Sequence, residues 1–305
     1  MTTTTKSNEK VILVTGATGT VGSEIVKQLT LPSASPSLDI RVRAAVHSQN
    51  KADEFKRNNK KVEVVNMDYN KPQTIAEVLN NVDKLFWLTL PRPNMTEISS
   101  NLIKEAKEND VRHIVKLSVM GADAEPGTTI GRLHRQEEKI IEESGIPYTF
   151  LRAGAFMQNF INFFGQTIKN QNAFYLPTGD GKVSFVDVRD IAGIAVGLLS
   201  KDRVQHEAKA YGITGQEALS YSQAAEILSK VIGKKISYVY ISQEDAQKSM
   251  KEMGMEDWLI AALIELYNII KAGYASQTTD TVEKIIGRKA ISFEQFVRDH
   301  VNSFN

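Results

Sequence analysis

Short apolar runs rich in β-branched residues alternate, in the first half of the chain, with longer segments in which apolar positions recur every three or four residues. Runs of the first kind predict strands, and segments of the second kind predict amphipathic helices. The six predicted strands are Lys10 to Thr15, Ile40 to Val46, Val62 to Val65, Lys84 to Leu88, His113 to Ser118 and Tyr148 to Arg152. Strands that alternate with helices in this way favour an α/β fold with one parallel sheet.

The pattern changes after Ala173. A short strand near Lys182 to Val186, a helix over Val188 to Ser200 and a strand over Lys209 to Ile213 are predicted next. Beyond them, apolar spacing of three and four predicts the helices Tyr221 to Ile232, Gln243 to Glu252, Glu256 to Ala272, Thr279 to Ile286 and Ser292 to Val301. We therefore expect an α/β domain over residues 1–175, with elements of 184–213 added to it. A smaller, mostly helical cap or substrate region is expected over residues 214–305.

A glycine-rich turn follows the first predicted strand. It reads Thr15, Gly16, Ala17, Thr18, Gly19, Thr20, Val21, Gly22, and an amphipathic segment comes directly after it. Gly16 lets the chain turn off the strand, Gly19 lets the backbone approach a pyrophosphate, and Gly22 lets the helix pack closely on the sheet. The new helix points its unpaired N–H groups and the positive end of its dipole at the phosphates. Three glycines alone are weak evidence, but this context predicts a Rossmann-type, doubly wound sheet that binds a nicotinamide dinucleotide through these residues.

The end of the second strand distinguishes NAD from NADP, because an acid there binds the ribose hydroxyls and repels a ribose phosphate. At that point the chain carries no acid and reads His47, Ser48, Gln49, Asn50, Lys51. Imidazole, hydroxyl and ammonium groups can bind a phosphate dianion. NADP(H) is therefore favoured over NAD(H), with His47, Ser48 and Lys51 as contacts. The alternative is that Ser48 and Lys51 only cap and start the next helix.

Taken together, these segments make the chain similar to the NmrA-like family of atypical short-chain dehydrogenase/reductases over nearly its whole length. The segments that carry the resemblance are Val14 to Gly22, Val42 to Ala52, Val115 to Asp123, Gly145 to Asn159, Ser184 to Ala192 and Thr279 to His300. Members that resemble this chain include triphenylmethane reductases and quinone or azo-dye reductases. NmrA itself resembles a redox sensor that binds the dinucleotide without clear turnover, so the family spans two functional classes.

The resemblance also implies places for residues at the ends of later strands. It places Asp68 near the adenine, Thr89, Leu90 and Pro91 beside the coenzyme, Ser118 and Val119 near the nicotinamide, and Gly154, Ala155 and Phe156 on the carboxamide side. Position in the fold agrees, because loops at the carboxyl ends of parallel strands surround the ligand site. Asp187 and Asp190 match a family motif too, and we interpret them as structural, since a carboxylate there more often holds a loop or caps a helix.

Ordinary short-chain dehydrogenases carry a Tyr and a Lys four residues apart on the helix after the fifth strand. The corresponding helix here, predicted over Arg132 to Ser144, has no Tyr. The one Tyr-x-x-x-Lys of the chain, Tyr267 with Lys271, lies in the helical cap and is interpreted as coincidence. His134 is the best candidate for a catalytic group that delivers a proton near neutral pH. The alternative for His134 is a surface or capping role.

A missing proton donor narrows the range of acceptors that the protein could reduce. Hydride addition to a simple ketone creates an alkoxide that needs a proton, whereas a conjugated acceptor spreads the charge. We expect an NAD(P)H-dependent reductase of a conjugated aromatic or quinone-like compound. The predicted substrate pocket is lined by Met157, Phe160, Phe164, Leu263 and Tyr267. The alternative for any one of these residues is a place in the core. The alternative function is an NADP(H)-sensing regulator that binds a protein partner, motivated by the absent Tyr and Lys pair.

Composition excludes several other classes of protein. Lys and Arg number 37 against 36 Asp and Glu, so no net charge favours a nucleic-acid partner. The chain has no cysteine, which excludes disulfides and thiolate metal sites, and its five histidines lack metal-ligand spacing. Charged and polar residues interrupt the longest apolar stretch, Trp258 to Tyr274, so no membrane span is expected. The polar start, Met1 to Glu9, favours a cytoplasmic protein, and the oligomeric state stays open.

Overall fold

A seven-stranded sheet is the main element of the computed structural model, which describes residues 10–31, 40–47, 49–201 and 204–305. Its strands are β1 (Lys10–Val14), β2 (Ile40–Val46), β3 (Glu63–Asn66), β4 (Lys84–Trp87), β5 (His113–Val119), β6 (Tyr148–Ala153) and β9 (Lys209–Ile213). They are ordered β3-β2-β1-β4-β5-β6-β9, so the chain order reverses between β1 and β4, as in a doubly wound fold. The predicted strands and the Rossmann-type sheet are confirmed.

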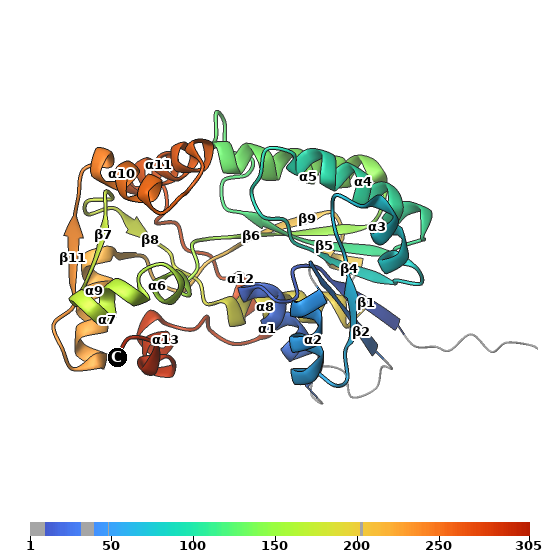
Figure 1. The fold of residues 1–305 in the computed structure, drawn as a ribbon, viewed down its shortest axis with the longest axis horizontal. Coiled ribbons are helices and arrows are strands. Elements are labelled where there is room, and N and C mark those ends of the chain that lie inside the picture. Colours follow the sequence, from blue (N-terminus) through green and yellow to red (C-terminus); the bar gives the residue numbers. More distant parts are fainter. Residues whose placement is uncertain (1–9, 32–39, 48, 202–203) are drawn as a thin grey trace, which may run out of the picture. The chain divides into compact units, whose positions relative to one another are not determined.

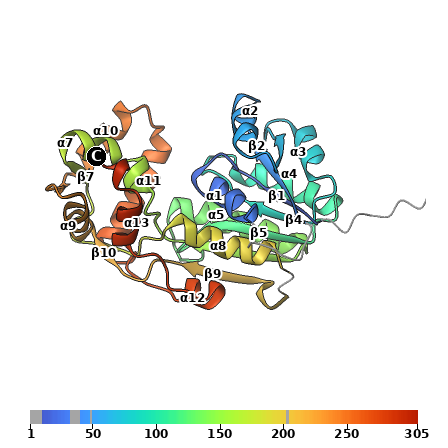
Figure 2. The same ribbon diagram turned by 90° about the horizontal axis from the view of Figure 1, so that it is seen from below.

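The strands at the switch point pair in parallel. β1 pairs with β2 and with β4, β2 pairs with β3, and β4 pairs with β5. The helices that connect or follow them are α1 (Thr20–Leu29), α2 (Gln49–Asn58), α3 (Pro72–Leu79), α4 (Met95–Glu108), α5 (Thr129–Ser144) and α8 (Val188–Leu199). In Figure 1, α3, α4 and α5 cover one face of the sheet. Figure 2, which shows the molecule from below, has α1 and α8 in front of the strands.

One apolar core fills the space between the sheet and α3, α4 and α5. Leu13 of β1 and Trp87 of β4 are fully buried in it, and Ile75, Leu102 and Ile141 reach it from the three helices. Alternation of apolar and polar positions along the helices directs their apolar side to this core. The core therefore holds the carboxyl ends of β1, β4 and β5 at one edge of a rigid sheet.

Contacts between residues divide the chain into two compact units. Unit 1 comprises the described residues within Met1–Ser118, Leu133–Leu151 and Ala192–Tyr211, and unit 2 those within Val119–Arg132, Arg152–Ile191 and Gly212–Asn305. The domain boundary expected from the sequence stood at residue 175, whereas this division already assigns the segment Arg152–Ile191 to unit 2. The reason is packing, because the residues after β6 share their apolar core with the C-terminal helices.

Unit 2 is mostly helical, as expected for the C-terminal region. Its helices are α6 (Asn159–Asn162), α7 (Gly165–Gln171), α9 (Tyr221–Ile232), α10 (Gln243–Glu252), α11 (Asp257–Lys271), α12 (Thr281–Ile286) and α13 (Phe293–Asp299). Two small sheets accompany them, in which β7 (Ala173–Leu176) pairs in parallel with β11 (Ser237–Tyr240), and β8 (Lys182–Val183) pairs antiparallel with β10 (Leu219–Ser220). Single 3-10 turns cover Val204–His206 and Val301–Ser303. Among the described residues, no helix is long and apolar enough to cross a membrane.

The helix α5 begins three residues earlier than the sequence predicts. The Glu265 carboxylate of α11 accepts hydrogen bonds from the backbone N–H of Thr129, at 2.5 Å, and from the Thr129 hydroxyl, at 3.0 Å. A carboxylate at a helix N-terminus satisfies an unpaired N–H group and interacts favourably with the helix dipole. This cap comes from a residue 136 positions away in the chain, so a search for a local capping residue does not find it.

Candidate functional site

The glycine loop connects β1 to α1 in a conformation that its glycines require. Gly16 has a φ of +61°, in the left-handed region that favours glycine. A Cβ atom on Gly22 would lie 2.2 Å from the carbonyl oxygen of Gly16, so no larger residue fits there unless the loop moves. Exposed on the outer side of the loop are Thr18, Gly19 and Thr20, and buried beneath it are Thr15, Val21 and Gly22.

The N-terminus of α1 opens at this loop. Gly19 is its N-cap residue, so no side chain caps the helix there, and its first turn carries no acidic residue. Backbone N–H groups at such a terminus, together with the helix dipole, favour an anion. The residues therefore fit the pyrophosphate of a dinucleotide, as the sequence predicts.

The end of β4 lies directly beside the glycine loop. The Thr15 hydroxyl donates to the Phe86 carbonyl oxygen, at 3.1 Å, and accepts from the Leu88 backbone N–H, at 2.8 Å. A Cβ atom on Gly16 would come within 3.1 Å of the Leu88 side chain. Thr89, the next residue, is buried, and Leu90 after it is 65% exposed. The segment after β4, from Leu88 to Pro91, therefore lies beside the glycine loop. Its last residue, Pro91, is half-buried.

The ends of β2 and β3 lie on the other side of β1. His47 follows β2 and is exposed, Ser48 lies outside the described residues, and Lys51 belongs to α2. Asp68 follows β3, and its carboxylate accepts from the Asn70 backbone N–H, at 3.0 Å. Asp68 is half-buried and shapes the turn after its strand. The predicted contacts to a ribose phosphate and to the adenine stay predictions.

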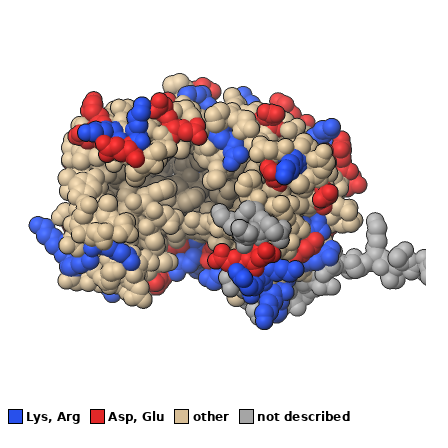
Figure 3. Space-filling model, in the orientation of Figure 1, with Lys and Arg blue, Asp and Glu red and all other residues tan. Residues whose placement is uncertain are grey.

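Positive charge gathers at the C-terminal end of α2 and just beyond it. Lys56, Arg57 and Lys60 line a surface cavity of about 470 Å³ together with Asp53. Figure 3 shows Lys and Arg atoms clustered where α2 lies in Figure 1. Lys56 and Arg57 lie in the last turn of α2 and Lys60 lies beyond it, so this charge is at the end of the helix away from the end of β2.

A half-buried tyrosine lies behind the same edge. Tyr69 packs edge-on against Trp87, with ring centroids 5.7 Å apart, and the Arg92 guanidinium lies 5.9 Å from the centre of the Tyr69 ring. Burial raises the pKa of Tyr69 to about 12, and the charge of Arg92 opposes this shift. A phenol with so high a pKa holds its proton at neutral pH, so Tyr69 is a poor proton donor.

Glu137 of α5 is the centre of a buried polar cluster. The Lys116 ammonium of β5 lies 2.8 Å from one of its oxygens, and both side chains are 0% exposed. The Thr89 hydroxyl donates to the same carboxylate at 2.8 and 2.9 Å, and the Ser99 hydroxyl of α4 donates to it as well. Four polar side chains from three elements and a loop are thus held together inside unit 1.

The neighbouring residue Glu138 forms a second, separate contact. Its side chain is also 0% exposed, and one of its oxygens accepts from the Ser118 hydroxyl of β5, at 2.7 Å. Its other oxygen accepts from Arg135, at 3.1 Å, and Arg135 also binds Glu142 at 2.8 and 3.2 Å. Successive residues of α5 therefore hold the hydroxyls at the ends of β4 and β5.

His134 is buried in this cluster. It is 5% exposed, and its Nδ1 lies 3.4 Å from Lys116 Nζ. The same Nδ1 lies 3.6 Å from the Glu137 carboxylate. Burial lowers the pKa of His134 well below its usual value, and the Lys116 charge lowers it further. The surface or capping role considered for His134 is therefore wrong, while its catalytic role stays a prediction.

The remaining predicted coenzyme residues belong to unit 2. Val119 ends β5, and Gly154 follows β6, where its N–H donates to the Ile213 carbonyl at 2.9 Å. A Cβ atom on Gly154 would approach the Ser184 carbonyl to 3.0 Å. Ala155 and Phe156 come next, and Phe156 forms an isolated parallel bridge with Val186. These residues form a tight loop after β6 whose contact with a coenzyme stays a prediction.

The aromatic residues predicted for the substrate pocket lie mainly in a core. Met157 and Phe160 are 0% exposed, and the Phe160 ring contacts the rings of Phe164, Phe174, Phe185, Tyr221 and Phe293. Phe164 is partly buried at the edge of this core. Leu263 and Tyr267 of α11 are also partly buried, and they pack on a smaller cluster between α10 and α11. Pattern alone does not separate a ligand wall from such a core.

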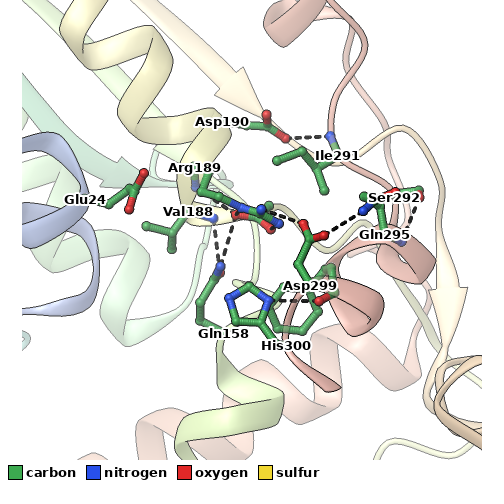
Figure 4. Close-up of polar contacts among 12 residues, drawn as sticks. Glu24, Gln158, Val188, Arg189, Asp190, Ile291, Ser292, Gln295, Asp299 and His300 are labelled. Atoms are coloured by element: carbon green, nitrogen blue, oxygen red, sulfur yellow. Dashed lines mark hydrogen bonds and ion pairs between the residues drawn. The ribbon is translucent and has the colours of Figure 1, made fainter. Parts of the chain in front are cut away.

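Asp187 positions Arg189 at the start of α8, and Arg189 binds Asp299 of α13; Figure 4 labels Arg189 and Asp299. Asp187 is fully buried and accepts from the Gln158 amide at 3.0 Å and from Arg189 Nη2 at 2.7 Å. Arg189 in turn binds Asp299 at 2.6 Å. These contacts to Asp187 and then to Asp299 raise the pKa of Arg189, against the effect of burial.

Asp190 has partners of the same kind. It pairs with Arg288 at 2.6 Å and accepts from the Ile291 backbone N–H at 2.8 Å. Burial raises its pKa, and the Ile291 N–H and Arg288 oppose the rise. All of these contacts hold neighbouring segments of unit 2 together, which supports the interpretation of both aspartates as structural. Within the described part of the chain, no group of three or more His, Asp or Glu could hold a metal ion.

A family model matches almost the entire chain: that of the NmrA-like family, over residues 8–297. The chain belongs to the NmrA-like family. It is 37% identical to an NAD(P)H azoreductase of Xenophilus azovorans over 96% of this chain and 99% of that protein. Its structure is similar to that of Citrobacter sp. triphenylmethane reductase complexed with NADP(H), with a TM-score of 0.79, 27% identity, and coverage of 94% and 99%. It is also similar to the NADPH-dependent quinone oxidoreductase QOR2 of Escherichia coli in complex with NADPH, with a TM-score of 0.80, 27% identity, and coverage of 97% and 100%.

This NmrA-like chain departs from ordinary short-chain dehydrogenases on α5. The Tyr267 and Lys271 pair does not replace the missing residues, because Lys271 donates to the Tyr240 hydroxyl, at 3.2 Å, and lies over that ring. Sequence reasoning missed Glu137, Glu138 and Lys116. The available signal was Lys116, a charged residue in the middle of an apolar central strand, which requires a buried partner.

Proposed function

We propose that this chain is an NAD(P)H-dependent oxidoreductase that reduces a conjugated aromatic or quinone-like acceptor and prefers NADP(H). The observation that carries the proposal is the glycine loop, in which Gly22 lies too close to the Gly16 carbonyl for any side chain. Such a loop at the start of α1 is built for a pyrophosphate. The similarity to an NAD(P)H azoreductase and to reductases complexed with NADP(H) or NADPH supports the same activity.

The preference for NADP(H) rests on charge near the end of β2. Between His47 and Ala52 the chain has no acidic residue, and Lys51 in this segment is basic. A carboxylate at this point would repel the additional phosphate of NADP, whereas basic side chains attract it.

The choice of acceptor rests on the protons available at the ends of β4 and β5. When bound, the coenzyme supplies a hydride. The acceptor takes up its two electrons, and the coenzyme is thereby oxidised. The Thr89 and Ser118 hydroxyls donate their protons to Glu137 and Glu138. His134 is neutral at pH 7, because burial lowers its pKa, so it has no readily released proton. Acceptors that spread the added charge, such as quinones and cationic dyes, suit this arrangement because they take their proton later from water.

The test is binding and turnover by the purified chain. We expect tighter binding of NADPH than of NADH by titration calorimetry. We also expect loss of NADPH absorbance with at least one member of a panel of quinones, azo dyes and cationic triarylmethane dyes. Coenzyme binding with no turnover across the panel would instead support a dinucleotide-sensing regulator. No binding of either coenzyme would refute both functions.

A further inference from the structure

The strand β11 forms one edge of a small sheet in unit 2. It pairs in parallel with β7 alone, and both strands are four residues long. In Figure 1, β11 is the outermost strand of unit 2, with β7 on its inner side. Val239 of β11 is 36% exposed and Tyr240 is 52% exposed. A two-stranded sheet is marginally stable by itself, so this edge is suited to receive a further strand.

The main-chain groups on the outer edge of β11 have no partner among the described residues. On the inner edge, Ser237 and Ile241 donate their N–H groups to carbonyl oxygens of the segment that contains β7, at 2.9 and 3.3 Å. Alternate residues of a strand direct their main-chain groups to opposite edges. Tyr238 and Tyr240 therefore direct theirs away from β7, and no hydrogen bond joins these N–H and C=O groups to a described residue.

We propose that β11 pairs antiparallel with β11 of a second copy of this chain, so that the two small sheets join into one. A twofold axis beside Val239 sets Tyr238 opposite Tyr240 of the second copy. In an antiparallel ladder such a pair exchanges both of its main-chain hydrogen bonds, so every unpaired group on this edge gains a partner. Twofold pairs are the commonest assemblies of identical chains. This contact needs no coenzyme, so it is independent of the proposed function.

Side chains on the exposed face of the small sheet fit the same register. Val239 lies beside Tyr175 of β7, and both are exposed, at 36% and 39%. In the twofold pair Val239 lies opposite Val239 of the second copy, and a Tyr175 flanks each of them. Neighbouring β-branched and aromatic side chains on adjacent strands stabilise a sheet. β11 itself contains no charged residue and no proline, the residues that usually keep an edge strand from pairing.

Charges at the two ends of β11 favour an antiparallel partner of the same sequence. Lys234 and Lys235 precede the strand. Glu244 and Asp245 follow it, in the first turn of α10. Lys234 and Glu244 each lie five residues from Val239, so the twofold axis brings the basic end of one copy to the acidic end of the other. Neither Lys234 nor Glu244 forms an ion pair with another described residue, so both are available for this contact.

Disulfide cross-linking tests the register. The chain has no cysteine, so Val239→Cys introduces its only thiol. Across the twofold axis Val239 occupies a non-hydrogen-bonded position, where opposite Cα atoms lie about 4.5 Å apart. A disulfide requires Cα atoms within about 7 Å of each other. The matched control is Tyr175→Cys, which adds a similarly exposed thiol one strand further out, about 14 Å from its counterpart. With diamide as oxidant, we expect Val239→Cys to form a covalent dimer at least about tenfold faster than Tyr175→Cys.

An exchange of charges tests the same contact without a disulfide. Lys234→Glu makes both ends of β11 acidic, and Glu244→Lys makes both ends basic. Each variant then repels its own copy, whereas a mixture of the two variants brings opposite charges together at both ends. Sedimentation velocity should show each variant alone dimerising about fivefold to tenfold more weakly than the unaltered chain, and the mixture regaining the dimer.

Controls for the charge variants come from the same helix. Glu252→Lys makes the same change of net charge at the other end of α10, and it should leave dimerisation unchanged. Thermal unfolding of all variants checks that they fold. Because so short an edge buries less area than a standard stable interface, we expect the dimer of the unaltered chain to depend on concentration.

The possible outcomes decide between occupants of this edge. A chain that stays monomeric at every concentration overturns the proposal and leaves the edge to a strand of another protein. Equal rates of cross-linking in Val239→Cys and Tyr175→Cys overturn it as well. A mixture of Lys234→Glu and Glu244→Lys that dimerises no better than either variant alone also overturns it. Selective cross-linking at position 239 together with recovery in the mixture supports it.

Discussion

The ion pair between Lys116 and Glu137 is expected to contribute more to stability than any exposed pair of the chain. Its atoms lie 2.8 Å apart and both side chains are 0% exposed. Lys116→Met leaves the Glu137 carboxylate buried without its counter-charge, and breaking such a pair costs about 3–5 kcal/mol. Lys284 and Asp280 provide the control, because they are 2.9 Å apart but 72% and 63% exposed. Lys284→Met should therefore cost less than about 1 kcal/mol.

Urea unfolding measures this difference, and a double-mutant cycle isolates the pair. Trp87 is fully buried in unit 1 and Trp258 lies in α11, so a Trp258→Phe background makes fluorescence report on unit 1. In Lys116→Met/Glu137→Gln neither charge of this pair remains, while Thr89 and Ser99 keep an accepting oxygen. We expect this double variant to be more stable than the sum of the single changes by about 2 kcal/mol. Strict additivity, or an equal cost for Lys116→Met and Lys284→Met, refutes the reasoning.

Three further predictions concern the glycine loop, the end of β2 and the buried imidazole of His134. Gly22→Ala places a Cβ atom 2.2 Å from the Gly16 carbonyl oxygen, so we expect calorimetry to show NADPH binding weakened at least about tenfold. In the control variant Gly165→Ala the nearest atoms to the new Cβ are 3.8 Å away, and NADPH should bind normally. His47→Asp brings a carboxylate to the end of β2, and the ratio of NADPH to NADH affinity should fall about tenfold; an unchanged ratio would show that this strand end does not face the ribose phosphate. The pKa of His134 lies well below 6.5 in the folded chain, so as pH falls below 6.5 the unfolded chain binds a proton first and the free energy of unfolding decreases. His134→Gln should flatten this dependence between about pH 6.5 and 5, by up to about 1.4 kcal/mol per pH unit, and an identical pH profile would contradict the buried, neutral state.

The elements that depend on local sequence are the ones that sequence reasoning predicts well. The run from β1 through the glycine loop to α1 is predictable because Gly16, Gly19 and Gly22 each meet a backbone requirement within a few residues of themselves. The strands β7 and β11 were not predicted. They are four residues each and pair across more than sixty positions, so neither segment is marked as a strand by its own sequence.

The polar cluster of unit 1 was missed for a related reason. Glu137 and Glu138 sit on an amphipathic helix, where acidic residues normally face solvent, and only the tertiary fold directs them to β4 and β5. Met157 and Phe160 differ, because their burial was predictable and their role was not. Aromatic and sulfur-containing side chains at helical spacing predict burial, but they do not show whether a ligand or a core covers them.

The same cluster explains how an NmrA-like chain can handle a coenzyme without the Tyr and Lys pair. In ordinary short-chain dehydrogenases the helix after the fifth strand supplies a proton, whereas here α5 supplies carboxylates that take up hydroxyl protons from Thr89 and Ser118. The only imidazole among them, His134, is kept neutral by burial and by Lys116, which lower its pKa. The protons of the hydroxyls at the ends of β4 and β5 are therefore directed at carboxylates, so under the proposed function these groups do not protonate the acceptor. This argues for acceptors whose reduction needs no proton in the hydride step, and a simple ketone should be the poorest substrate in any panel.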